Sequence, residues 1–272
     1  MRRLTCCFLL LALPASLLAH NTWLVPMRFR AAPGDSIRVR VATSEAFPSS
    51  DSLLKLERVA RFTLRDTSGA RNVTGYREDG LFLVADVVPP RAGHVVVVAE
   101  SKPRAFVLPA KTFAEYLKEE HRDDVLAARQ RAGTAAAEGR ERYRKVTKAI
   151  LCVGGKPGEV PADALFQSDE GSWLEIIPEQ SPCGLKRGDS IRVRVLFNGK
   201  PYANAHVAAG YAGTKGHHYP FTTKTDADGR ARFKLTRDGV WYIRAHNIVA
   251  TQNDSEADWE SAFSTLTFEV LP

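Results

Sequence analysis

The eight residues GDSIRVRV occur twice in this chain, as Gly34–Val41 and as Gly188–Val195. In both copies Ile, Val and Val alternate with Ser or Arg, which is the period-2 pattern of a strand with one buried face. Such a pattern after Gly-Asp is common in β-sandwiches. The repeat therefore predicts two similar modules.

The segments around the two copies also have the character of short strands. FTLRD, GLFLVADV and HVVVVAES follow the first copy, and RARFKL, VWYIRAH and STLTFEVL follow the second. Asn198-Gly199 and the DADG stretch at Asp226–Gly229 are typical of hairpin turns. Short strands at this close spacing indicate sandwiches.

The region between the modules is rich in Ala, Glu, Arg and Lys, and we expect it to be helical. In its second half Tyr143, Val146, Thr147 and Ile150 recur at helical spacing. The predicted fold is therefore mainly β: two immunoglobulin-like β-sandwich modules, residues 20–109 and 153–272, joined by an α-helical connector, residues 110–152.

The first residues have the order of a secretory signal. Arg2 and Arg3 precede an apolar run over residues 8–18, which is too short to span a bilayer, and the small Ala19 ends it. We expect residues 1–19 to be removed, which leaves 253 of the 272 residues in a periplasmic or secreted protein with no stable membrane insertion.

Charge and cysteine content restrict the classes of function and site that the chain can have. Loss of the two signal arginines lowers the formal net charge from +7 to +5, and the other basic residues are scattered among acidic ones, so no nucleic-acid surface is expected. The mature chain keeps Cys152 and Cys183, an even pair in a compartment where disulfides persist. These two cysteines are predicted to form a disulfide.

His20 is the residue with the most informative chemistry. Cleavage after Ala19 would place an α-amine and an imidazole on one residue, and these two nitrogens can chelate one metal ion. Nickel, cobalt, copper and zinc suit such nitrogen ligands better than calcium or magnesium does. His217, His218 and His246 are the candidates to complete the site.

These three histidines differ in their setting. His217 and His218 are adjacent in a Gly-containing loop, where usually only one of two neighbours can point at a given ion. His246 shares a strand face with Tyr242 and Arg244, opposite Trp241, so it is expected to point outward if Trp241 faces the core. Taken singly, the sequence around each of them favours a solvated surface histidine over a metal ligand.

Motifs for enzymatic chemistry are absent from the sequence. It contains no nucleophile elbow, no HExxH pair and no phosphate-binding loop. We therefore expect a protein that is not an enzyme.

Several segments resemble one bacterial family. They are HNTWLVP at His20, AFP at residues 46–48, ERYRKVTKAIL, DGVWYIRAHN and WESAFSTLTFEV. The chain resembles periplasmic proteins of largely undescribed function that carry the label of a nickel or cobalt uptake component. Its second module is also similar to carboxypeptidase-regulatory sandwiches. The resemblance implies handling of nickel or cobalt, with a membrane metal transporter as partner.

Three hypotheses follow for the function. The first is a periplasmic binding protein for nickel or cobalt that assists uptake. The second is a sandwich module without metal, for envelope adhesion or assembly. The third is a copper protein that uses its N-terminal histidine for oxygen chemistry and needs a second histidine within reach.

Overall fold

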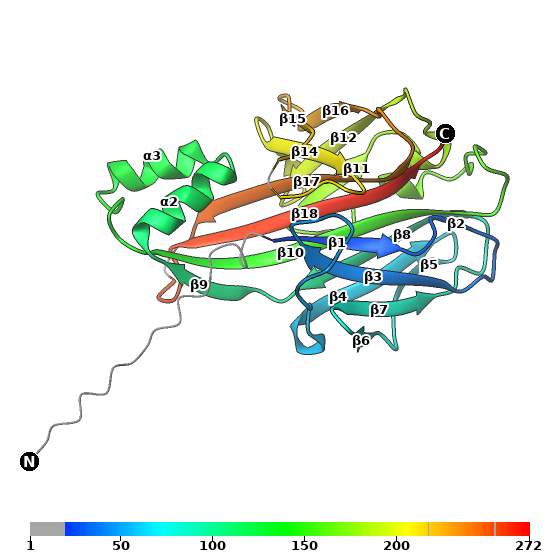
Figure 1. Cartoon of the computed structure of the whole chain (residues 1–272), viewed down its shortest axis with the longest axis horizontal. Coiled ribbons are helices and arrows are strands. Elements are labelled where there is room, and N and C mark those ends of the chain that lie inside the picture. Colours follow the sequence, from blue (N-terminus) through cyan, green and yellow to red (C-terminus); the bar gives the residue numbers. More distant parts are fainter. Residues whose placement is uncertain (1–19, 217, 253) are drawn as a thin grey trace, which may run out of the picture.

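The computed structural model describes residues 20–272 except residues 217 and 253. The predicted signal peptide and the candidate ligand His217 lie outside the described residues. Within them the fold is mainly β, as predicted, with two α-helices (Figure 1). Neither helix is long and apolar enough to cross a membrane.

The strands form three sheets. The largest has the order β15-β14-β17-β18-β10-β8-β4-β5, with β2 and β9 added to β10. Its strands are β2 (Arg30–Ala31), β4 (Val59–Asp66), β5 (Gly69–Asn72), β8 (Gly93–Ser101), β9 (Arg104–Leu108), β10 (Gly139–Val153), β14 (His206–Tyr211), β15 (Phe221–Lys224), β17 (Gly239–Ala250) and β18 (Trp259–Val270).

Two four-stranded sheets accompany the large sheet. The first has the order β1-β3-β7-β6 and consists of β1 (Asn21–Pro26), β3 (Ile37–Ser44), β6 (Arg77–Asp79) and β7 (Phe82–Val87). The second has the order β11-β12-β13 with β16 beside β12, and consists of β11 (Leu174–Pro178), β12 (Ser190–Phe197), β13 (Lys200–Pro201) and β16 (Arg230–Lys234).

The two copies of the repeat fold alike. The first becomes β3 and the second β12, so each lies in the small sheet of its own half. The aspartate of each copy accepts a backbone N–H from three residues upstream, Asp35 from Ala32 at 3.0 Å and Asp189 from Lys186 at 2.9 Å. This shared turn starts each strand in the same register, and the alternation predicted from the sequence is confirmed.

The middle of the large sheet is covered on both sides. On β8, Val95 and Val97 belong to the core under β3, whereas Val96 and Val98 belong to the core under β12. A strand that is buried on both faces needs a continuous apolar run, and the VVVV segment supplies one. The two sandwiches therefore share the large sheet.

The predicted helix over the second half of the connector is wrong. Those residues form β10, which pairs with β8, β9 and β18. Its last nine residues are all buried, so an apolar residue at every third or fourth position reflects burial on two faces and not a helical stripe. The first half of the connector does form helices, α2 (Ala110–Glu119) and α3 (Asp123–Arg131).

The two predicted hairpin turns differ in outcome. Asn198 and Gly199 have positive φ values of 49° and 70° and join β12 to β13, as expected for a hairpin. The DADG stretch also makes a tight turn, with Gly229 donating to the Asp226 carbonyl at 3.0 Å. It connects β15 of the large sheet to β16 of a small sheet, however, so it is not a hairpin.

Candidate functional site

One face of β17, β18 and β10 carries an unusual row of side chains. In the strand register His246 lies opposite Phe263, and Phe263 lies opposite Lys145. The three side chains therefore share one face of the sheet. The His246 ring stacks on Phe263 with centroids 4.3 Å apart, and the Lys145 ammonium lies 3.6 Å from the centroid of the same Phe263 ring.

Strand β1 and helix α2 cover this face. Thr265 Oγ1 donates to the Thr22 carbonyl at 2.6 Å, which fastens β1 across β18. Farther along the sheet, Tyr116 of α2 contacts His246 through its hydroxyl, 3.1 Å from Nε2. The start of β1 and the helix α2 thus cover different parts of the same face of these three strands (Figure 1).

His246 is consequently buried and does not point to solvent as predicted. It is 4% exposed, and Trp241 does face the core. The alternation along β17 was predicted correctly, but α2 covers the second face as well. Burial lowers the pKa of His246 to about 3, so its imidazole is neutral at physiological pH.

The charged groups around His246 form a buried network. Arg244 donates to Glu120 Oε2 at 2.7 Å, and His246 Nδ1 lies 3.5 Å from the same oxygen. The Tyr116 hydroxyl donates to Glu141 Oε1 at 3.0 Å. These are contacts between side chains that are at most 5% exposed.

Burial shifts the pKa values of two further groups in this network. It raises the pKa of Glu141 to about 7, although hydrogen bonds from Ser261 and Tyr116 oppose the rise. It lowers the pKa of Lys145 to about 7, since the ammonium loses its hydration. The face beneath β1 therefore holds a carboxyl and an amine that both titrate near neutrality.

The network is linked directly to the predicted mature N-terminus. Lys145 Nζ donates to the His20 carbonyl oxygen at 2.8 Å, and Asn21 Nδ2 donates to the Tyr219 hydroxyl at 3.1 Å. Trp23, Phe47 and Tyr242 then pack against one another immediately after this start. The first residues of β1 are held in place by hydrogen bonds and aromatic packing.

The His20 imidazole lies between two carboxylates. Its Nδ1 is 3.1 Å from Asp51 Oδ1, and its Nε2 is 3.5 Å from Glu45 Oε1. The side chain is 9% exposed, and Nδ1 is a buried atom that makes no hydrogen bond of acceptable geometry. A ring nitrogen without a proton and a carboxylate oxygen both present lone pairs, so a metal cation could accept both atoms as ligands at this position.

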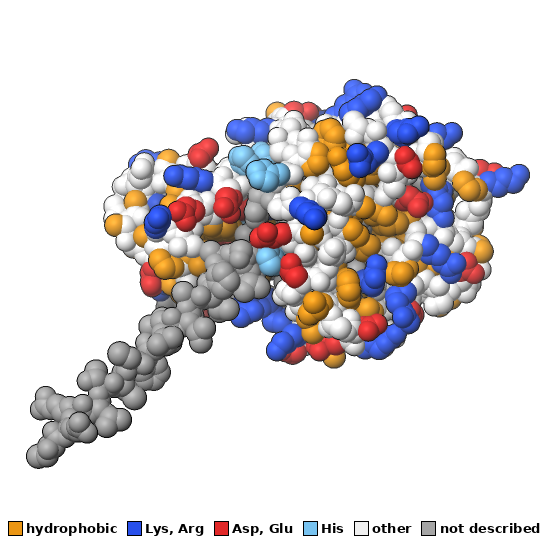
Figure 2. Space-filling model, viewed as in Figure 1, with side chains coloured by type: hydrophobic (Ala, Val, Ile, Leu, Met, Phe, Trp, Pro, Cys, Tyr) orange, Lys and Arg blue, Asp and Glu red, His pale blue; other side chains and the backbone are white. Residues whose placement is uncertain are grey.

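The loop that carries His218 adjoins this arrangement, since the Gly216 N–H donates to the Glu45 carbonyl at 2.7 Å and the Tyr219 hydroxyl accepts from Asn21 Nδ2. His218 is exposed in the loop before β15. In the part of the chain that the structure describes, no three side chains of His, Cys, Asp or Glu are arranged so that they could hold a metal ion by themselves. Figure 2 shows histidine and acidic side chains gathered between the helices and the sandwiches.

A second buried histidine lies in the large sheet, at a position where no sequence motif pointed to a site. His94 of β8 is fully buried, with Nδ1 2.9 Å from Asp163 Oδ1 and Nε2 2.6 Å from Ser181 Oγ. The order of contacts is that of a serine-hydrolase triad. Phe166 covers the ring, and Ser181 Oγ accepts the Cys183 N–H, so the arrangement ties two loops to the sheet.

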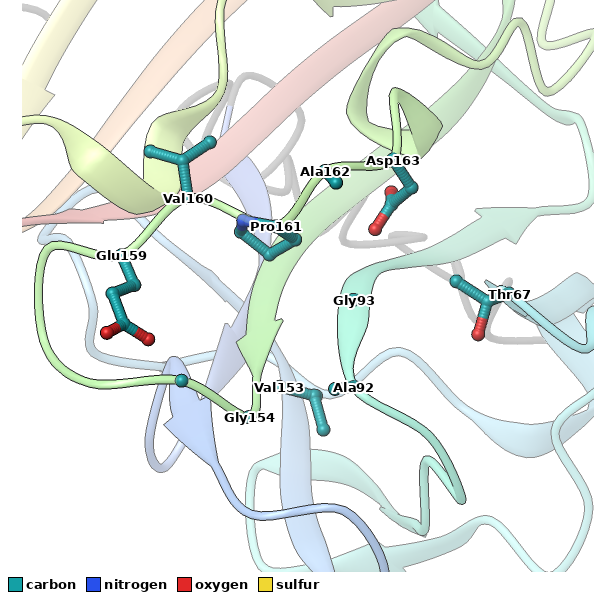
Figure 3. Close-up of a pocket in the computed structure, with 11 residues that line it drawn as sticks. Thr67, Ala92, Gly93, Val153, Gly154, Glu159, Val160, Pro161, Ala162 and Asp163 are labelled. Atoms are coloured by element: carbon teal, nitrogen blue, oxygen red, sulfur yellow. The ribbon is translucent and has the colours of Figure 1, made fainter.

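A pocket of about 320 Å³ adjoins this histidine (Figure 3). It lies where β10 ends and the following loop turns back past Gly93. Both acidic side chains in its lining have hydrogen-bond donors, since Asp163 accepts from His94 and Leu165, and Glu159 accepts from the Lys156 N–H. The pocket offers no reactive group of its own.

The disulfide is present as predicted. Cys152 at the end of β10 is bonded to Cys183, with the two Cα atoms 5.7 Å apart. It joins the shared sheet to the segment that leads into β12.

Comparison with known proteins identifies a family without an assigned activity. A family model described as "Domain of unknown function (DUF4198)" matches residues 17–249. No curated protein matches the chain.

Solved structures give only distant similarities. The D0-D1 domain of intimin is 11% identical over 92% of this chain and 97% of its own, with a TM-score of 0.23. The Yersinia pseudotuberculosis adhesin InvE is 13% identical over 90% of this chain and 58% of its own, with a TM-score of 0.25. The Escherichia coli adhesin FdeC is 13% identical over 90% and 62%, with a TM-score of 0.25. This chain thus spans less than two thirds of either adhesin structure.

Proposed function

Because the chain belongs to the family described as domain of unknown function DUF4198, whose name assigns no activity, we propose a function from its own residues. The exported, processed protein binds one divalent transition metal ion, nickel or cobalt, at its N-terminal residue His20. It acts without catalysis and hands the ion to an uptake system in the membrane. The observation that carries this proposal is the His20 imidazole held between Asp51 and Glu45.

The chemistry of the terminal residue supports a chelate. Cleavage before His20 would create an α-amine, whose pKa of about 8 lets a metal displace its proton near neutral pH. The amine and Nδ1 of one histidine can bind the same ion. Asp51 Oδ1, 3.1 Å from Nδ1, is placed to supply a third ligand, and Glu45 lies beside Nε2. Two nitrogens and a carboxylate oxygen suit nickel, cobalt, copper or zinc.

The surroundings support a site that exists before the ion binds. Lys145 holds the His20 carbonyl, and Thr265 holds the carbonyl of Thr22 two residues later. A ligand set held by packing and hydrogen bonds loses less conformational entropy on binding. The α-amine of the mature chain adds a ligand that comes from the backbone and not from a side chain.

The third ligand in this proposal is Asp51 in place of a second histidine. His246 already contacts Tyr116 and Glu120 and is buried beneath α2. A copper site for oxygen chemistry would need a second histidine at the same ion. Among the described residues, the side chains that contact the His20 imidazole as ion-pair partners are the two carboxylates.

Calorimetry with nickel, cobalt and copper tests the proposal. The mature form beginning at His20, confirmed by intact mass, is compared with a form that carries one extra glycine before His20. The extension keeps the imidazole and removes its partner amine. We expect the mature form to bind one ion and the extended form to lose that binding, while thermal unfolding of the two metal-free forms coincides.

Two substitutions complete the design. Asp51→Asn should weaken binding by at least about tenfold, since it removes a charged ligand, whereas His218→Ala should leave it unchanged. Equal affinity of the extended and mature forms would refute the terminal chelate. Absence of binding by the mature form would favour a sandwich module for envelope adhesion or assembly.

A further inference from the structure

The outer face of β12 and β16 carries an array of arginines. Along β12 the buried Ile191 and Val193 alternate with Arg192 and Arg194. Along β16 the buried Ala231 and Phe233 alternate with the exposed Arg230, Arg232 and Lys234. Because side chains alternate between faces, all five basic residues point away from the core.

The arginines lie directly opposite one another. In the register of the two strands Arg192 faces Arg232, and Arg194 faces Arg230. Side chains in such pairs have Cβ atoms about 5 Å apart, and like charges there repel each other. Two successive pairs of like charge are therefore unfavourable for the folded chain alone.

Few acidic groups compensate this charge. Glu179 pairs with Arg230 at 2.7 Å and reaches Arg192 at 3.9 Å, and Asp228 also pairs with Arg230. Within the described residues neither Arg194 nor Arg232 forms an ion pair within 4 Å, although the charge of Arg194 contributes to the lowered pKa of the nearby Asp169. Arg194 Nε is moreover a buried donor without a hydrogen bond.

In the first copy of the repeat the corresponding arginines do not lie opposite other arginines. Arg38 and Arg40 of β3 correspond to Arg192 and Arg194 of β12. Arg38 lies opposite Asp86 and pairs with it at 2.9 Å, and Arg40 lies opposite Val84. The neutralising partner present in the first module is replaced by arginine in the second.

The array borders a depression of about 500 Å³. Arg192, Arg194 and Arg230 line it together with Glu179, so its charged lining sums to +2. Ile177 and Pro178 add an apolar surface. A volume of this size is in the range of small-molecule sites, which cover roughly 300–1,000 Å³.

We propose that this depression binds a small ligand with a phosphate monoester or diphosphate group. A phosphate monoester carries about two negative charges at neutral pH and a diphosphate carries more, so either is attracted to a lining of +2, and arginine forks fit the phosphate oxygens. The site is independent of His20, because β12 and β16 cover the face of β17 that carries Trp241, and β1 covers the face that carries His246.

Titration of the metal-free mature protein with pyrophosphate, in the presence of EDTA, tests this site. We expect saturable binding that weakens with salt and falls by about tenfold or more in Arg194→Gln, since one charged contact is lost. Arg38→Gln is the matched control, because it removes the same charge from the same local sequence, and it should bind like the unchanged protein.

The source of the phosphate group is distinguished with vesicles. Vesicles of phosphatidylcholine with phosphatidic acid present the monoester on a lipid, and vesicles of phosphatidylcholine alone present none. Binding to the former but not to free pyrophosphate would support the phosphate site with a lipid headgroup as its source. Absence of binding to both probes, or equal loss in Arg194→Gln and Arg38→Gln, would overturn the proposal.

Discussion

Removal of the Cys152–Cys183 disulfide should cost a measurable and calculable part of the stability. The bond closes a loop with a sequence separation of 31 residues between the end of β10 and the segment before β12. In the chain-entropy model a loop of that length destabilises the unfolded state by about 3.7 kcal/mol at 25 °C. Both cysteines are at most 6% exposed, and alanine at the two positions deletes only their sulfur atoms, so loss of the bond is the main change.

The expected change in melting temperature follows from the size of the protein. For the 253 residues of the mature chain the unfolding entropy is about 0.5 kcal/mol/K, so 3.7 kcal/mol corresponds to a loss of about 7 °C. Because the large sheet passes through both sandwiches, we expect a single transition. Denaturation by urea and by heat measures both quantities for the mature protein and for Cys152→Ala/Cys183→Ala.

A reducing agent supplies the control. It should lower the stability of the unchanged protein to that of the double variant and leave the variant itself unaffected. A loss below about 1 kcal/mol on removal of the bond would refute the loop-closure reasoning. A reductant effect that persists in the variant would show that the agent acts elsewhere.

Two further predictions concern the buried charges. Since the folded pKa of Glu141 is raised to about 7, the folded chain binds the extra proton between about pH 4.5 and 7, and stability falls as pH rises through that range. Glu141→Gln keeps an oxygen for Tyr116 and Ser261 and should abolish this fall, so it should stabilise at pH 8 more than at pH 5 in urea titrations; equal effects at both pH values would contradict the raised pKa. Glu175→Gln should destabilise by about 3 kcal/mol or more, because it leaves the buried Lys148 ammonium unpaired, and the added change Lys148→Met should restore most of the loss. If Lys148→Met restores nothing, the unpaired charge is not the cause.

The fold could be predicted from the sequence wherever one face of a strand is exposed. Both copies of the repeat and the helices around Tyr116 and Val125 follow from local patterns, and the disulfide follows from the even cysteine count expected of an exported chain. β10 could not be predicted in this way, because burial on two faces removes the alternation that marks a strand and β10 lacks the continuous valine run that marks β8. Its pairing with β18 joins residues more than a hundred positions apart, and no local pattern encodes that pairing.

For the candidate site as well, local sequence predicts some features and only the tertiary structure shows the others. His20 could be found from the sequence, because the signal peptide pattern ends immediately before it. Asp51 and Glu45 could not, since their approach to the imidazole depends on how the loop after β3 folds. His246 was placed on the correct side of β17 and given the wrong exposure, because only the tertiary structure shows α2 above it.

The start of β1 links the proposed metal site to the buried network through the hydrogen bond between Lys145 and the His20 carbonyl. Its first carbonyl is held by Lys145, whose pKa of about 7 means that the ammonium donating this hydrogen bond exists only in part of the molecules at neutral pH. An ion bound at the His20 amine would place positive charge near this ammonium and favour its neutral form. By linkage, ionisation of Lys145 and binding of the ion oppose each other, so the affinity should rise with pH beyond the titration of the His20 nitrogens themselves. Lys145→Met would remove that additional dependence, and the loss of its hydrogen bond to the His20 carbonyl would lower the affinity at every pH.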